Sequence, residues 1–262
     1  MTRLQLIGGG KMAAALLGGL LARGWAAVAE LHVVETSAAR RDLLGVTHPG
    51  LSVGEEPVTA ADALIAVKPD VVPVVLPGLA GAGVTRVLSI AAGVRAETIE
   101  AGLPGGVAVV RCMPNTPALV GVGAAAIAGG AAATADDLDW AQGILEAVGT
   151  VVRVPEADLD AVTGLSGSGP AYVFLLAEAL TRAGIAEGLP PHVADALTRQ
   201  TLLGAATLLV ESGADPASLR VDVTSPGGTT EAGLAVFADG DFTDLIGRVV
   251  AAATERSRVL GS

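Results

Sequence analysis

The sequence predicts an α/β fold, a doubly wound sheet followed by an all-α C-terminal region, and three observations support this prediction. Short apolar runs alternate with helical stretches up to about residue 156 of 262, a pattern typical of a sheet covered by helices on both faces. From Asp158 onward no strand-like run occurs and helical periodicity takes over. Aromatic residues make up only 2% of the chain, so small and branched side chains must form the core, as in parallel sheets.

Seven apolar runs are expected to form strands. The first five are short and rich in Val, Ile and Leu, as buried parallel strands are, and they cover residues 4–8, 31–35, 63–67, 84–92 and 107–113. Two further strands are expected at 123–130 and 149–154, with a helix from about Thr134 to Val148 between them. Ala- and Leu-rich stretches separate most of the first five runs, as the crossovers of a parallel sheet require.

The C-terminal region is expected to be all-α. Its periodic segments are 170–188, 190–213, 229–240 and 242–260. Pro170 fits the first turn of a helix, and "GLP" at 188–190 marks the end of one helix and the start of the next. The change of pattern places a domain boundary near Glu156, which gives one domain at 1–156 and a second at 157–262.

Charge and composition exclude several classes of protein. A formal net charge of −11 without any basic run argues against a partner that is a nucleic acid or an anionic membrane. No run of 18 uncharged apolar residues occurs, so no membrane span is expected. Met12–Ala22 resembles the core of a signal peptide, but a strand-like run and three glycines precede it and Arg23 ends it. The single cysteine, Cys112, fits a reducing compartment, and a cytoplasmic protein is predicted.

A glycine-rich turn follows the first expected strand and precedes a helix. It reads Gly8-x-Gly10-x-x-Ala13, in which the first glycine permits a tight turn and the second lets a pyrophosphate approach the backbone. The small third residue lets the helix pack closely on the strand, and the helix N-terminus attracts phosphate. This context predicts dinucleotide binding, with a structural turn as the alternative.

The end of the second expected strand bears on the choice of cofactor. Glu35 lies at the distance where an acidic residue accepts hydrogen bonds from the adenosine ribose, which favours NAD. Thr36, Ser37, Arg40 and Arg41 follow at once, and such residues can hold the 2′-phosphate of NADP. The sequence therefore leaves both NADPH and NADH open.

Three further stretches fall at the carboxyl ends of expected strands, where a doubly wound sheet binds its ligands. They are 66–70, 89–94 and 113–121, and prolines stiffen the first and third. Asn115 carries a donor and an acceptor that suit a carboxamide, although Asn between prolines is also a common turn residue. Lys68 is either a general acid or a structural or electrostatic group.

Two segments rich in small residues lie in the second half. In 223–237, a turn at Ser225–Gly228 precedes Thr229 and Thr230, which are expected to open a helix as capping residues do. Backbone N–H groups and hydroxyls then converge at a positive helix end, which predicts a carboxylate or phosphate site. The segment 165–172 is a second helix start, explained mainly by close packing and alternatively by lining a site.

With these motifs assembled, the chain resembles the pyrroline-5-carboxylate reductases nearly from end to end. The resemblance rests, in order, on "IGGGKMA", "AVKP", "SIAAGV", "VRCMPNTP", "GLSGSGPAY" and "SPGGTT", of which the last is the most specific. The sequence departs from the family pattern at Lys11, at Gly54, where a cofactor-contacting Asn is common, and at Ala238.

The resemblance implies reduction of the C=N bond of 1-pyrroline-5-carboxylate to L-proline with NADPH or NADH, on a Rossmann-type domain followed by a helical dimerisation domain. It implies an interlocked homodimer that builds a decamer. It places Ser225 and the amides of Gly228 and Thr229 at the substrate carboxylate, Thr230 at the ring nitrogen as the catalytic residue, and Glu156 near the product. With Glu35 and Ser37 from the reasoning above, the cofactor-binding set is Ile7, Gly8, Gly9, Gly10, Lys11, Met12, Glu35, Ser37, Ala66, Val67, Lys68, Pro69, Ala91, Ala92 and Asn115.

The residues outside the motifs agree with this chemistry. A cyclic imine is readily protonated near neutral pH, so the protein needs neither a strong acid nor a covalent nucleophile. The histidines lie outside every motif, Cys112 is expected in the core, and no metal-binding cluster is evident. A β-hydroxyacid dehydrogenase would need a lysine in the helical region, but no lysine follows Lys68. A non-catalytic NAD(P) sensor would not need the run at 225–230.

Overall fold

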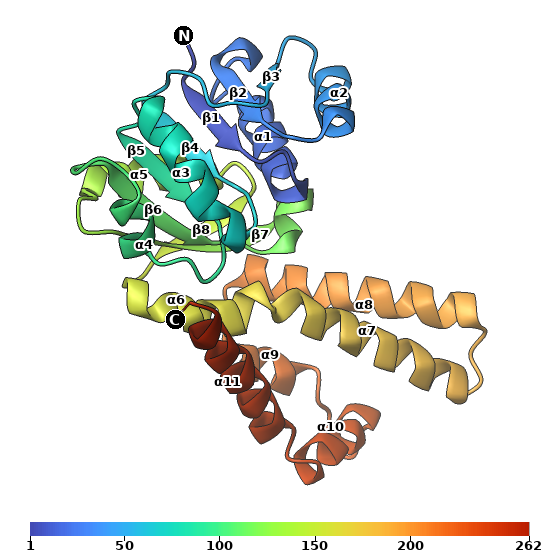
Figure 1. The fold of residues 1–262 in the computed structure, drawn as a ribbon. Helices are drawn as coiled ribbons and strands as arrows, with labels where there is room; N and C mark the ends of the chain where they lie inside the picture. The colour runs from blue at the N-terminus through green and yellow to red at the C-terminus, as the bar shows by residue number, and fades with distance from the viewer. Residues whose placement is uncertain (262) are drawn as a thin grey trace. The chain divides into compact units, whose positions relative to one another are not determined.

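The computed structural model describes residues 1–261, and within them eight strands form one mixed sheet (Figure 1). The spatial order is β3-β2-β1-β4-β5-β6-β7-β8. The bounds are β1 Leu4–Ile7, β2 Leu31–Val34, β3 Ser52–Gly54, β4 Asp62–Ile65, β5 Arg86–Ser89, β6 Ala108–Met113, β7 Gly123–Gly129 and β8 Gly149–Arg153. Every neighbouring pair is parallel except β6 and β7. The five expected parallel strands are thereby confirmed.

Helices cover the sheet on both faces, as the doubly wound prediction requires. On one face, Leu16, Leu17 and Leu20 of α1 (Lys11–Ala22) form a core with Leu44 of α2 (Ala38–Thr47) and Ile144 of α5 (Ala135–Leu145). On the other, α3 (Val72–Gly81) and α4 (Ala96–Ala101) contribute apolar side chains to a second core. The cores consist of aliphatic side chains and alanines, as the scarcity of aromatic residues predicts.

The structure differs from the expected elements in two respects. The short strand β3 (Ser52–Gly54) was not among the expected ranges, because three residues are too few to show an apolar period. The expected strand at 84–92 is shorter, since the ladder of β5 ends at Ser89. Apolar residues beyond the end of a strand continue its pattern: Ile90 still donates its N–H to the Ile65 carbonyl oxygen of β4, but residues 91 and 92 belong to the loop that follows.

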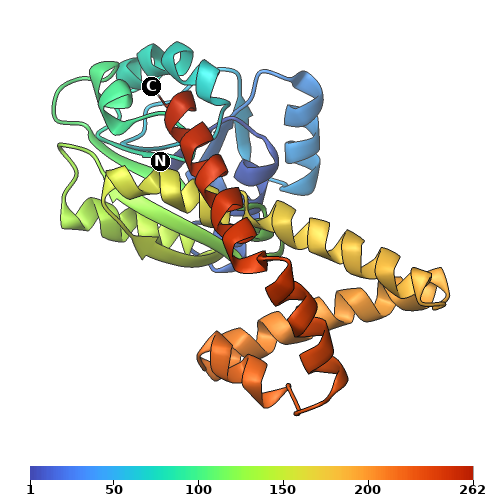
Figure 2. The ribbon, with the colours of Figure 1, turned by 90° about the horizontal axis from the view of Figure 1, so that it is seen from below.

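Two compact units divide the described chain: residues 1–168 with 251–261, and residues 169–250. The second consists of helices, as expected: α7 (Gly169–Ala186), α8 (Pro191–Ser212), α9 (Pro216–Asp222), α10 (Thr229–Asp239) and the start of α11 (Phe242–Leu260). Helices α7 and α8 lie side by side as a hairpin (Figures 1 and 2). None of the described helices is long and apolar enough to cross a membrane.

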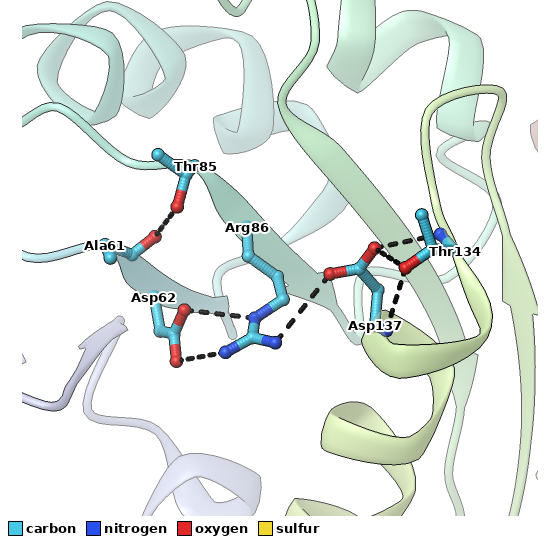
Figure 3. Close-up of polar contacts among 6 residues, drawn as sticks. All are labelled: Ala61, Asp62, Thr85, Arg86, Thr134 and Asp137. Carbon is cyan, nitrogen blue, oxygen red and sulfur yellow. Dashed lines mark hydrogen bonds and ion pairs between the residues drawn. The ribbon is translucent and has the colours of Figure 1, made fainter.

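At the amino edge of the sheet, Arg86 connects three elements (Figure 3). Its Nε and Nη2 donate to the Asp62 carboxylate at 3.1 and 2.8 Å, and its Nη1 lies 3.7 Å from Asp137 Oδ1. The guanidinium also lies over the ring of Trp140, 4.3 Å from the ring centroid. Asp137 forms a capping box with Thr134 at the start of α5. Since this edge is opposite the carboxyl ends of the strands, the Arg86 cluster stabilises the sheet and does not form part of a site.

Substitution of Asp62 by Asn is expected to destabilise the sheet unit by about 1–3 kcal/mol, because the mostly buried guanidinium loses a bidentate charged partner. Urea unfolding followed by circular dichroism measures the change. The matched control is Asp139→Asn, which removes an exposed aspartate paired with Arg153 and is expected to change stability by less than about 1 kcal/mol. Equal effects of the two substitutions would show that the Arg86 cluster contributes no more than a surface ion pair.

Candidate active site

The glycine-rich turn between β1 and α1 fits a pyrophosphate. Gly8 has φ +102°, and a Cβ atom there would lie 2.8 Å from the Ala66 carbonyl oxygen, so only glycine is accommodated. Gly10 is the N-cap of α1 and has no side-chain cap among the described residues, and a Cβ placed on it would meet nothing within 4 Å. The first N–H groups of α1 lack intrahelical partners and lie at the positive end of a helix, as phosphate binding requires.

A cleft of about 730 Å³ lies on one side of this turn. Seven of the predicted cofactor residues line it, together with the side chains that follow β2, β3 and β4. The predicted residues are Ile7, Gly8, Gly10, Glu35, Ala66, Val67 and Lys68. The rest of the wall consists of Val34, Thr36, Arg40, Glu55, Glu56, Pro57, Val71, Val74, Val75 and Gly78. An apolar wall beside several charged groups suits an adenosine.

A second cleft, of about 320 Å³, lies on the other side of the same turn. It is lined by Gly10, Lys11, Met12, Ala66, Val67, Lys68, Ile90, Ala92, Met113 and Pro114. Gly10, Ala66, Val67 and Lys68 line both clefts, so one extended molecule can lie across the turn. Five predicted residues do not line either cleft: Gly9, Ser37, Pro69, Ala91, which is buried, and Asn115.

Asn115 is held by the protein itself. Its Nδ2 donates to the Ser166 carbonyl oxygen at 3.1 Å, and its Oδ1 accepts the Ala124 N–H at 2.8 Å. These bonds connect the turn after β6 to β7 and to the segment at 163–167. The structural alternative for Asn115 is therefore realised, and a contact with a carboxamide would have to use its remaining donor and acceptor capacity.

The small-residue segment before α7 packs closely, as expected. Residues Thr163–Gly167 form one π-helical turn, and a Cβ atom at Gly167 would lie 2.4 Å from Cε of Met113. Because Met113 lines the second cleft, this turn supports one wall of that cleft. Close packing thus explains Gly167.

Glu156 is anchored to the sheet. Its Oε1 accepts the Ala96 N–H at 2.8 Å and a bond from Arg111 Nη1 at 2.7 Å. Partial burial acts to raise the pKa of Glu156, but the Ala96 amide and the Arg111 guanidinium outweigh it and hold that pKa below its usual range. Glu156 therefore stays ionised, and the bonds give it a positioning role between β6 and α4.

The turn at Ser225–Gly228 lies in the helical unit, and one expectation about it is wrong. The N-cap of α10 is Gly228 and carries no side-chain cap among residues 1–261, so neither threonine caps the helix. The hydroxyls of Thr229 and Thr230, both exposed, are thus not used for capping. Gly227 has φ +69°, and its N–H donates to Glu231 Oε2 at 2.7 Å, which fixes the turn.

The predicted amide donor of Gly228 is not free. Its N–H donates to the Ser225 carbonyl oxygen at 3.0 Å, and a Cβ atom on Gly228 would lie 2.9 Å from the same oxygen. Gly228 therefore shapes the turn. The N–H groups of Thr229 and Thr230 begin α10, and the first N–H groups of a helix lack intrahelical partners. Of the two amides predicted to hold the substrate carboxylate, that of Thr229 lies at the helix start and that of Gly228 is engaged within the turn.

Two of the side chains expected to be inert, Cys112 and His32, are buried in the sheet unit. Cys112 is buried in β6, and burial raises the pKa of its thiol far above the usual value, which rules out a thiolate nucleophile. The expectation of a core cysteine is confirmed. His32 is buried in β2, where its Nδ1 lies 2.9 Å from Ser52 Oγ.

Sequence reasoning missed several residues of the site. Val71, Val74 and Val75 form the apolar wall of the larger cleft, and Glu55 and Glu56 lie beside it. The run "VVPVV" directly after "AVKPD" was the available signal for the wall. Arg111, the partner of Glu156, is a charged residue within a buried strand, and this unusual position was the available signal for it.

Comparisons with known proteins match the dimerisation region and nearly the whole chain. The family model for pyrroline-5-carboxylate reductase dimerisation matches residues 156–260. A pyrroline-5-carboxylate reductase of Synechocystis sp. is 47% identical over 99% of this chain and 98% of its own length. The solved structure of a pyrroline-5-carboxylate reductase from Coxiella burnetii has a TM-score of 0.93 at 34% identity, covering 100% of this chain and 99% of that one. That of Plasmodium falciparum, solved with NADP bound, has a TM-score of 0.84 at 27% identity over 100% and 98%.

Proposed function

This chain belongs to the pyrroline-5-carboxylate reductase family, and on that premise we propose which of its residues bind the cofactor and the substrate. It is an NAD(P)H-dependent oxidoreductase that reduces 1-pyrroline-5-carboxylate to L-proline in proline biosynthesis. One observation carries the residue assignment: two clefts meet at the glycine-rich turn and share Gly10, Ala66, Val67 and Lys68.

The larger cleft is proposed to hold the adenosine and the smaller one the nicotinamide. The N–H groups at the start of α1 hold the pyrophosphate between them. The walls of the nicotinamide cleft are formed in part by Ala66, Val67, Ala92 and Met113. Asn115 and Pro69 do not line this cleft, and they contribute by fixing the turns that carry its lining residues. When bound, the reduced nicotinamide supplies the hydride that converts the C=N carbon of the substrate to a saturated carbon.

The turn before α10 is proposed to hold the substrate. The Ser225 hydroxyl and the Thr229 N–H bind the carboxylate at the positive helix end, and Gly228 keeps the turn in shape. The Thr230 hydroxyl orients the ring nitrogen as the only side-chain group assigned a direct catalytic contact. Because the protonated imine already accepts hydride readily, these residues contribute by orientation and do not need to transfer a strongly held proton.

The helical unit is proposed to build an interlocked homodimer, with a decamer as the larger assembly, and each active site to use both chains. The exposed apolar side chains of α7 and α8, among them Phe174, Leu197, Leu203 and Val210, support a partner over this unit. The family match from residue 156 supports a functional boundary there. The single cysteine supports a cytoplasmic location.

Hydrogen exchange in the presence of the product tests the substrate assignment. Saturating L-proline together with the oxidised cofactor is expected to slow exchange of the Thr229 and Thr230 amides, since the carboxylate would accept their bonds. D-proline at the same concentration is the control, and it should protect less. Unchanged exchange at these amides, with protection elsewhere in the chain, would move the carboxylate site away from this turn.

A further inference from the structure

Glu35 has an unusual position beside the glycine-rich turn. It follows β2 directly, and each of its carboxylate oxygens accepts a backbone N–H. Gly9 donates to Oε2 at 3.1 Å, and Ser37, the N-cap of α2, donates to Oε1 at 2.8 Å. The side chain is only 9% exposed. A fixed negative charge therefore lies between the starts of two helices.

The cationic side chains that follow Glu35 are already paired with carboxylates. Arg40 Nη1 lies 3.7 Å from Glu35 Oε2, and Arg41 Nη2 lies 2.6 Å from Glu55 Oε1. Arg41 also donates to the carbonyl oxygens of Glu35 and Thr36, which turns it toward the backbone. Glu35, Glu55 and Glu56 all line the larger cleft, against Arg40 and Lys68. The adenosine end of the cleft therefore carries no excess of positive charge.

NADH and NADPH place different demands on this position. The 2′-hydroxyl of NADH can donate a hydrogen bond to a carboxylate whose other lone pairs accept backbone N–H groups. The 2′-phosphate of NADPH needs cations and N–H donors. In this chain the Ser37 N–H is taken by Glu35, and the carboxylate would repel the phosphate.

From these contacts we propose that Glu35 makes the enzyme prefer NADH over NADPH. The inference rests on the proposed placement of the adenosine in the larger cleft. Arg40 does not reverse the preference, because its side chain is 60% exposed and solvent screens its attraction for a phosphate. The Plasmodium relative was solved with NADP, whereas the preference of this chain follows from its own carboxylates.

The expected effect is on the ratio of the affinities for NAD⁺ and NADP⁺. Wild-type enzyme binds NAD⁺ at least roughly tenfold more tightly than NADP⁺, a range typical of one discriminating charged contact. Glu35→Ser removes the charge and releases the Gly9 and Ser37 N–H groups, so the ratio falls by roughly tenfold or more, mainly through tighter binding of NADP⁺. Glu35→Gln keeps the size of the side chain and moves the ratio in the same direction.

Isothermal titration of the full-length protein with NAD⁺ and with NADP⁺ measures this ratio without any turnover. The matched control is Asp42→Asn, which removes one negative charge, as Glu35→Gln does. Asp42 lies on α2 at an exposed position outside the cleft, so this substitution is expected to leave the ratio of the two affinities unchanged. Kinetics with 1-pyrroline-5-carboxylate and each reduced cofactor should show the same ratio in kcat/KM.

Two results would overturn the inference: wild-type protein that binds NADP⁺ as tightly as NAD⁺, or a Glu35→Ser variant that weakens both cofactors equally. The wild-type ratio decides even if a variant does not fold. Failure of the proposed function would give a different result. The protein would then bind NAD⁺ and NADP⁺, but adding 1-pyrroline-5-carboxylate would cause no oxidation of NADH or NADPH.

Discussion

Gly8→Ala is expected to weaken binding of the reduced cofactor by roughly thirtyfold or more, a loss of about 2 kcal/mol or greater. Two costs combine at this position. The backbone has φ +102°, where a residue with a Cβ atom is strained by about 1–2 kcal/mol. The new methyl would also lie 2.8 Å from the Ala66 carbonyl oxygen. Relief of this contact displaces the Ala66–Lys68 stretch that lines both clefts.

Fluorescence titration with NADH measures the loss of affinity. Gly18→Ala, in the helix α1 that follows the turn, is the control, because a Cβ atom there meets nothing within 4 Å, and alanine in a helix interior stabilises by about 0.5–1 kcal/mol. Thermal unfolding of both variants separates loss of binding from loss of fold. Unchanged NADH affinity in a folded Gly8→Ala variant would remove the turn from the cofactor site.

Thr230→Ala is expected to lower kcat roughly tenfold or more, while the fold stays intact. The hydroxyl proposed to orient the ring nitrogen is lost, and one such bond contributes about 1.5 kcal/mol. The helix itself should not suffer, because Thr230 is exposed, does not cap α10, and alanine is the better helix former.

Thr230→Ser retains the hydroxyl and is expected to restore most of the turnover. Steady-state kinetics of the three proteins, with saturating NADH and varied 1-pyrroline-5-carboxylate, distinguish loss of kcat from a rise in KM. Wild-type kinetics in Thr230→Ala would exclude the Thr230 hydroxyl from the mechanism and leave the Ser225 hydroxyl and the amides at the start of α10 as the contribution of this turn.

The sheet and the glycine-rich turn were predictable because their determinants are local. Apolar runs between helical stretches define β1, β2, β4, β5 and β6, and Gly8 and Gly10 define the turn by residue type alone. The long helices of the second unit show their period in sequence as clearly. The resemblance to a family then indicated the reaction.

Contacts between segments far apart in the chain were not predictable. The pairing of Glu156 with Arg111 and Ala96 spans up to 60 residues, and the engagement of Asn115 depends on a carbonyl 51 residues away. The cap of α10 was missed for a different reason: two threonines favour capping by type, but the turn places Gly228 at the N-cap and uses its N–H internally. Residue type shows what a side chain can do, and the tertiary contacts decide which of its groups are already engaged.

Oxidation of NADH and NADPH by the purified protein, followed at 340 nm with and without 1-pyrroline-5-carboxylate, distinguishes a reductase of this imine from a protein that only binds the cofactor. We expect oxidation that depends on the substrate, yields L-proline, and is faster with NADH at equal subsaturating cofactor. If both cofactors bind but neither is oxidised when the substrate is added, the cofactor clefts stand and the assignment as a reductase of this imine is contradicted.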